Sequence, residues 1–149
     1  MTSPDPTSPT DPSPYANAVL LDHARHPRGR GAMSRATHRG RAENVLCGDT
    51  VDVSLVVEDD RVRAAAFEAT GCAIVVAVAS MLVERAEGWT VAGARERAAA
   101  VAAALVDGTV AFPEGFEALT DLRALATRHA CALLPWKALG RAIAEPPAS

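Results

Sequence analysis

The strongest constraint on the fold is the stretch V-D-V-S-L-V-V at positions 51–57, which begins as a clean alternation of apolar and polar residues. Alternation with a period of two is typical of a strand that has one buried and one solvated face. The acidic residues 58–60 form a turn sequence, and residues 61–67 read as a second strand. The pattern therefore predicts an antiparallel β-hairpin.

Helical segments are predicted on both sides of this hairpin. The apolar run that begins at Ala73 is ambiguous, but its continuation into S-M-L-V-E-R-A-E favours a helix that ends at Gly88. The other predicted helices cover residues 15–25, 91–106, 117–125 and 131–144, with residues 28–44 as a long loop. We therefore expect an α+β domain, in which a small antiparallel β-sheet of about three strands packs against a layer of helices.

Two details of these helices follow from their sequences. The first helix is expected to carry Val19, Leu20 and His23 on one face and to stop before Pro27. The last helix is expected to hold Pro135 in its first turn, the part of a helix that tolerates proline best.

The ends of the chain differ in composition from its middle. Residues 1–14 contain five of the ten prolines together with Ser, Thr and Asp, so they are expected to form a disordered tail. Residues 15–145 are expected to form a single domain, and residues 146–149 a second short tail. No apolar run approaches the roughly 20 residues of a membrane span, and the first residues do not resemble a secretory signal. We therefore expect a soluble, cytoplasmic protein.

Charge is distributed unevenly along the chain. Residues 1–42 carry six Arg and three Asp, a net charge of +3, whereas the whole chain carries −3, so the remainder carries −6. The basic segment, residues 25–41, has no aromatic residues that could stack on bases, and the acidic remainder would repel a phosphate backbone. No nucleic-acid partner is therefore expected, and the segment is either a solvated loop or a surface that docks an acidic partner.

The three cysteines lie at the edges of predicted elements. Cys47 precedes the first strand, Cys72 precedes a helix, and Cys131 begins a helix. A helix N-terminus lowers the pKa of a thiol, so Cys72 and Cys131 are predicted to have lowered pKa values. Their spacing does not by itself establish a site, because there is no C-x-x-C pair. The alternative is that the three cysteines are small hydrophobic residues of the core and form no site.

A metal site would need a fourth ligand beside the three thiolates. Asp49 is the best candidate, since one glycine separates it from Cys47, and His129, two residues before Cys131, is the second. Structural zinc sites prefer Cys and His. A carboxylate among thiolates therefore suggests a ligand set that can be exchanged, which points to function rather than to scaffolding.

Four sequence blocks occur in a characteristic order. They are D-H-x-x-x-P-R-x-x-G at 22–31, N-x-x-C-G-D at 44–49, F-x-x-x-G-C-x-I at 67–74 and C-A-x-L-x-W-x-A-L at 131–139. In this order, and with all three cysteines in register, the chain resembles the U-type iron–sulfur assembly proteins, the IscU/SufU family, which includes the N-terminal domain of NifU. The resemblance spans residues 15 to about 144.

Three features resemble the SufU branch more than the IscU branch. The segment between Cys72 and Cys131 is long, with an insert around residues 107–125; Ala130 stands where IscU proteins have histidine; and the L-P-P-V-K motif is missing. The resemblance implies Zn²⁺ held by Cys47, Asp49, Cys72 and Cys131. It also implies a sulfur shuttle, which takes persulfide sulfur from a PLP-dependent, SufS-like cysteine desulfurase and passes it to the SUF cluster-assembly complex. Such a protein is a partner of the desulfurase rather than a stand-alone enzyme.

Cys47 is the predicted sulfur acceptor, because its turn is expected to be the most exposed and mobile of the three cysteine positions. One alternative is a scaffold whose ligands hold iron or a nascent [2Fe–2S] cluster, and another is an interaction domain that zinc only stabilises. The chain departs from the family at Val45, where the family has proline, and at Ala130, where the R-x-K-C motif of SufU-like proteins has lysine. Arg128 is kept, and His129 is gained beside the lost lysine. Arg128 and His129 are therefore auxiliary candidates near the site.

Overall fold

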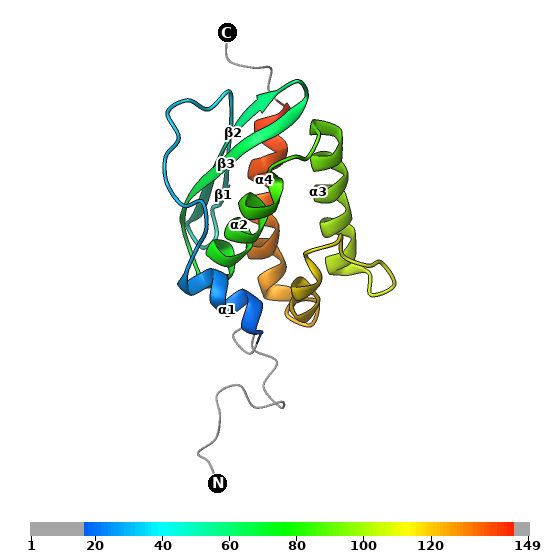
Figure 1. Cartoon of the computed structure of the whole chain (residues 1–149). Coiled ribbons are helices and arrows are strands. Elements are labelled where there is room, and N and C mark those ends of the chain that lie inside the picture. Colours follow the sequence, from blue (N-terminus) through cyan, green and yellow to red (C-terminus); the bar gives the residue numbers. More distant parts are fainter. Residues whose placement is uncertain (1–16, 145–149) are drawn as a thin grey trace.

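The computed structural model describes residues 17–144, so the predicted tails 1–14 and 146–149 lie outside the described residues. A three-stranded antiparallel sheet of order β1-β2-β3 carries helices on one of its faces (Figure 1). This arrangement confirms the predicted α+β class. The elements in chain order are α1 (Ala18–Arg25), β1 (His38–Asn44), β2 (Asp49–Glu58), β3 (Arg61–Thr70), α2 (Ala73–Ala86), α3 (Val91–Val106), the 3₁₀ helices η2 (Glu117–Leu122) and η3 (Ala126–Arg128), and α4 (His129–Ala144).

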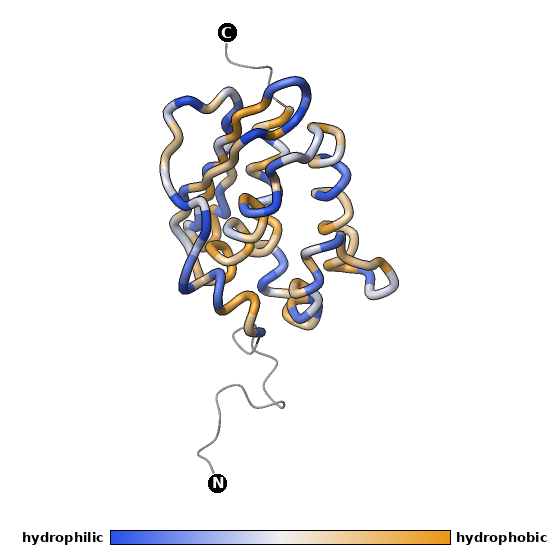
Figure 2. The backbone as a smooth tube through the Cα atoms, viewed as in Figure 1, coloured by the Kyte–Doolittle hydropathy of each residue, from blue (hydrophilic) through white to orange (hydrophobic). Residues whose placement is uncertain are grey.

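The predicted hairpin is present as β2 and β3. Inward-facing residues of β2 are fully buried at alternate positions, namely Val51, Val53 and Leu55. Asp59 and Asp60 at the turn both have positive φ, 53° and 63°, a conformation that matches the right-handed twist of the paired strands. Hydrophilic residues gather at this turn, whereas the strands and α2 contain long hydrophobic segments (Figure 2).

Strand β1 corrects the prediction of a long loop over residues 28–44. Its sequence H-R-G-R-A-E-N buries only Ala42, so it carries no apolar alternation. Its inner face is instead covered by α4, which approaches the backbone closely at Gly40. A Cβ at Gly40 would overlap backbone atoms of Ala138 and Ala142. Small residues on the inner face therefore allow the contact that makes this segment a strand.

Helix α2 forms the centre of the core and packs on β3, while α4 packs on β1 and β2. The ten residues from Ile74 to Val83 are all buried, which explains why this helix lacks an amphipathic pattern. It ends at Ala86, two residues before the predicted end, and Gly88 follows with φ of +94°. None of the helices within residues 17–144 is both long and apolar enough to span a bilayer.

Three helix predictions need adjustment. In α1, Leu20 and His23 are buried as expected, but Val19 is 48% exposed, because it lies about 100° around the helix from Leu20. Helix α4 begins at His129, so Pro135 lies in the second turn rather than the first. The missing N–H of Pro135 removes the helical hydrogen bond to the carbonyl of Cys131. The predicted helix 117–125 is the shorter 3₁₀ helix η2.

Candidate metal centre

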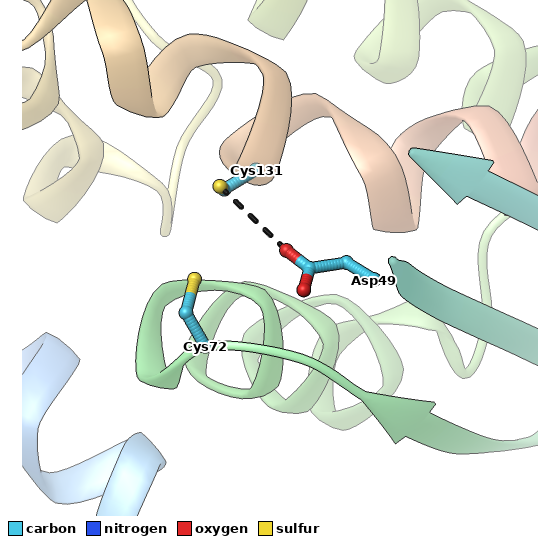
Figure 3. Close-up of side chains that lie close together, drawn as sticks. All are labelled: Asp49, Cys72 and Cys131. Carbon is cyan, nitrogen blue, oxygen red and sulfur yellow. Dashed lines mark hydrogen bonds between the residues drawn. The ribbon is translucent and has the colours of Figure 1, made fainter. Parts of the chain in front are cut away.

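Three of the predicted ligands converge at one end of the domain. Asp49 begins β2, Cys72 is the N-cap residue of α2, and Cys131 lies in the first turn of α4 (Figure 3). One donor atom from each lies within 4.8 Å of the others. The core packing of β2, α2 and α4 therefore brings together side chains that are far apart in the sequence.

The cluster is largely shielded from solvent. Asp49 is 8% exposed and Cys131 5% exposed, while Cys72 is half-buried. The Cys131 thiol donates to the Asp49 carboxylate, with 3.9 Å between Sγ and Oδ2. A carboxylate at this depth gains from a compensating positive charge.

The pKa of the Cys131 thiol is raised to about 11, chiefly by burial and in smaller part by the neighbouring Cys72 thiol and Asp49 carboxylate. The side chain of Arg128 acts in the opposite direction. The prediction that the helix N-terminus lowers this pKa is therefore wrong for Cys131, because loss of solvation outweighs the helix dipole. A bound cation would reverse this balance and favour the thiolate.

The donor set fits a tetrahedral metal ion. Ligand atoms around zinc at about 2.0–2.3 Å are separated by about 3.3–3.8 Å, which the three donors reach through small inward movements. Two thiols and one carboxylate supply three of four tetrahedral positions. Thiolate ligands suit both zinc and iron, so the geometry is compatible with either metal.

Cys47 lies outside this cluster, on the turn 45–48 that joins β1 to β2. The turn is organised by Asn44, whose side chain accepts from the Leu46 N–H at 3.1 Å and whose carbonyl accepts from the Gly48 N–H at 2.8 Å. Gly48 has φ of +76°, a conformation that favours glycine. Cys47 is exposed, and the two residues before it, Val45 and Leu46, are 85% and 95% exposed. The predicted four-ligand set is therefore divided between a buried cluster and an exposed turn.

The two auxiliary candidates behave differently. The Nε2–H of His129 donates to the carbonyls of Leu122 and Arg123, at 3.0 and 3.1 Å, so its ring is engaged with η2. Arg128 is exposed, and its side chain lowers the pKa of the Cys131 thiol. His129 therefore supports the segment before α4, whereas a role of Arg128 at the cluster stays a prediction.

A polar network that sequence reasoning missed, buried at His23 and Ser80, supports α2. The Oγ of Ser80 lies 2.6 Å from Nδ1 of His23 and accepts from the Arg28 N–H at 2.8 Å. Arg28 also pairs with Asp22 at 2.6 Å and with Glu84 at 3.5 Å. The block D-H-x-x-x-P-R was the available signal, because it places these polar residues around the end of α1. The network ties α1 and the following loop to the helix whose N-cap is Cys72.

The sequence matches a known family over most of its length. The model of the NifU-like N terminal domain matches residues 15–146. The iron–sulfur cluster assembly scaffold protein IscU of Thermotoga maritima is 31% identical over 138 residues, covering 87% of this chain and 92% of the relative. The zinc-dependent sulfurtransferase SufU of Bacillus subtilis is 28% identical over 131 residues, covering 85% and 88%. The resemblance to the IscU/SufU family is therefore confirmed.

Solved structures show the same fold. The crystal structure of an iron–sulfur cluster assembly scaffold protein for the SUF system, SufU of Fervidobacterium islandicum, aligns with a TM-score of 0.75 at 25% identity, covering 85% of this chain and 94% of that one. A NifU-like N-terminal protein from Brucella abortus aligns with a TM-score of 0.80, covering 88% and 93%, and at 24% identity it supports the fold alone. Relatives of both the scaffold and the sulfurtransferase kind are thus similar to this chain.

Proposed function

Because the chain belongs to the family of NifU-like N-terminal domains, we propose that it is a zinc-dependent sulfur-transfer protein of iron–sulfur cluster assembly. In this proposal Cys47 accepts persulfide sulfur from a cysteine desulfurase, and Cys47, Asp49, Cys72 and Cys131 form the zinc ligand set. The observation that carries the proposal is the contrast between an exposed Cys47 and a largely shielded cluster formed by the other three residues.

The three clustered residues bind the metal in this proposal. Asp49, Cys72 and Cys131 sit on elements that are packed into the core, so their donor atoms have little freedom to separate. When bound, zinc would keep the thiols as thiolates at neutral pH, which the buried Cys131 thiol does not reach by itself. Arg128 adds positive charge beside Cys131.

Cys47 is the residue that accepts the sulfur in this proposal. Its thiolate attacks the terminal sulfur of the persulfide on the desulfurase, and a new S–S bond forms at Cys47. The S–S bond of the desulfurase persulfide breaks, and the cysteine thiolate of that enzyme leaves. One sulfur atom moves, with no net oxidation or reduction. Cys131 is too deeply buried for such an attack, whereas Cys47 can enter a partner's active site.

The partner is a SufS-like cysteine desulfurase, and the SUF cluster-assembly complex is the onward acceptor. Val45 and Leu46 place an apolar surface directly before the reacting cysteine. Such residues are costly to leave in water and gain from burial in a partner. Among the basic residues, Arg28 is already paired within the fold and Arg30 donates to the Ala69 carbonyl, so they have structural partners as well as charge.

A scaffold for a nascent [2Fe–2S] cluster is the second candidate, favoured by the 31% identity to an IscU protein and by a donor set that suits iron. Metal analysis and visible absorption of the purified protein distinguish the two. A colourless protein with about one zinc per chain supports sulfur transfer, whereas a brown protein with iron and sulfide supports the scaffold.

A third candidate is a domain that zinc only stabilises. Desulfurase assays distinguish it from a sulfur-transfer protein. The cysteine desulfurase of the same organism is assayed for sulfide or alanine release with the wild-type chain and with Cys47→Ser. Sulfur transfer predicts stimulation by the wild type that Cys47→Ser loses while the variant remains folded. If neither protein changes the desulfurase rate, the purely structural role is favoured and the proposal fails.

A further inference from the structure

Gly71 lies across the sheet from Asp49 and directly before Cys72. The β2–β3 pairing joins Thr50 to Thr70, and the same register places residue 71 opposite residue 49. A Cβ added to Gly71 would lie 2.9 Å from Cγ, 3.0 Å from Oδ1 and 3.2 Å from Cβ of Asp49. These are its three nearest atoms, so the space beside Gly71 is occupied by the Asp49 side chain.

Backbone conformation does not account for a glycine here. Gly71 is not among the glycines with positive φ, whereas Gly48 and Gly88 are. An alanine could therefore adopt the same backbone without the strain of the left-handed region. What alanine could not do is leave the Asp49 carboxylate where it is, because carbon atoms do not approach to 2.9 Å without one of them moving.

We propose that Gly71 is a positioning residue of the metal centre, whose missing side chain leaves the space in which the Asp49 carboxylate turns toward Cys72 and Cys131. Asp49 has a short side chain on a strand that is paired on both sides, so it cannot retreat by moving its Cα. It is also 8% exposed, which leaves few other directions for a charged group. A methyl group at position 71 would therefore displace a donor atom of the cluster.

The inference rests on the proposed metal centre and is tested on metal binding rather than on sulfur transfer. Zinc affinity is measured by competition with a chelator, and the cobalt-substituted protein is examined by its d–d absorption, for the wild type, Gly71→Ala, Asp49→Ala and the double variant. Gly71→Ala is expected to lower zinc affinity about tenfold to a hundredfold, the range typical of groups that orient a ligand, and to change the cobalt spectrum. In the Asp49→Ala background, Gly71→Ala should cause no further loss.

Gly108→Ala is the matched control, because Gly108 also lacks a positive φ and a Cβ there would meet nothing within 4 Å. It should leave affinity and spectrum unchanged. If Gly71→Ala fails to fold, the double variant must recover the fold, since Asp49→Ala removes the clashing carboxylate.

Three results would overturn the inference: Gly71→Ala with unchanged zinc affinity and cobalt spectrum, an equal loss of affinity in the Asp49→Ala background, or a double variant that stays unfolded. A wild-type protein that binds neither zinc nor cobalt would overturn the metal centre itself, and the role of Gly71 with it. A wild type that binds metal but accepts no sulfur would refute the proposed function and leave the role of Gly71 standing.

Discussion

The buried cluster and the exposed turn place the same kind of side chain in opposite environments. Cys131 is 5% exposed and lies on a helix packed against two strands. Cys47 is exposed, and its neighbour Leu46 is 95% exposed. The two regions adjoin in the sequence, since Gly48 alone separates Cys47 from Asp49, yet only one of them is part of the core.

Metal binding and contact with a partner can therefore belong to different segments of one site. The cluster is positioned by β2, α2 and α4, so its donor atoms can shift only slightly without disturbing the core. The turn 45–48 is held chiefly by hydrogen bonds to Asn44, which a partner can accommodate or replace. We therefore expect substitutions in the two regions to affect different measurements.

The largest expected effect is on metal affinity. Cys131→Ser should lower zinc affinity more than about a hundredfold, beyond what the loss of an orienting neighbour costs. Cys47→Ser should cost less, because Cys47 is on the exposed turn and is the ligand that leaves most easily. Chelator competition on both variants measures this order, with circular dichroism to check the fold. Equal losses would remove the distinction between the two regions.

The buried region also depends on how closely α4 approaches β1. Gly40→Ala should lower the free energy of unfolding by about 1–3 kcal/mol, because its methyl group would overlap the backbone of α4, the helix that carries Cys131. Urea denaturation of the metal-free protein measures the change. Gly140→Ala, within α4 itself, is the control: its Cβ meets nothing within 4 Å, and it should stabilise the helix slightly. A harmless Gly40→Ala would contradict the close packing.

Substitutions in the exposed turn should instead weaken binding to the partner. Leu46→Ser is expected to weaken binding to the cysteine desulfurase about tenfold, in line with the burial of one large apolar side chain, while zinc affinity stays the same. Val106→Ser is the matched control, because Val106 is 75% exposed at the end of α3. Calorimetric titration measures the affinity of the desulfurase for the wild type and for each of the two variants. Equal weakening by both variants would show that general surface hydrophobicity, rather than the turn, governs binding.

The smallest expected effect is on the pH dependence of stability, through His23, which contacts Ser80 of α2. Burial lowers the pKa of His23 below its usual 6.5, and the charge of Arg28 lowers it further, against the opposing effect of Glu84. The neutral ring is thus favoured in the folded state. Its stabilising contribution is fully present above about pH 6.5 and is lost as the pH falls through the lower pKa of the folded protein.

Thermal melting of the metal-free protein between pH 8 and pH 5 measures this dependence. His23→Gln should flatten the fall in melting temperature at low pH. His26→Gln, at an exposed position of the same segment, should keep the wild-type profile. An unchanged pH dependence in His23→Gln would assign the acid sensitivity to other groups.

Sequence patterns predicted elements where local periodicity decides the structure. The hairpin and α3 follow from alternation and from helix propensity, and both are present near their predicted bounds. Strand β1 was missed because its inner face is made of Gly40 and Ala42, and because its pairing depends on α4, about a hundred residues away. Small residues at a close packing contact do not produce the alternation of large apolar residues by which a strand is predicted from sequence.

The site was predicted by resemblance rather than by spacing. Cys72 and Cys131 are far apart in the chain, so only the packing of α2 and α4 brings them together with Asp49. The pKa of Cys131 was predicted with the wrong sign, because desolvation depends on the whole tertiary structure. The greater exposure of Cys47 was predicted from its place in a polar turn and is confirmed. The structure adds that the other three predicted ligands form a separate cluster.

Mass spectrometry of the chain after incubation with its cysteine desulfurase and cysteine identifies the cysteine that accepts the sulfur. We expect a product heavier by one sulfur atom, with the modification mapping to Cys47 after alkylation and proteolysis, and its loss in Cys47→Ser. A sulfur adduct that maps to Cys131 or Cys72 while Cys47 stays unmodified would contradict the division between a holding cluster and a reacting turn.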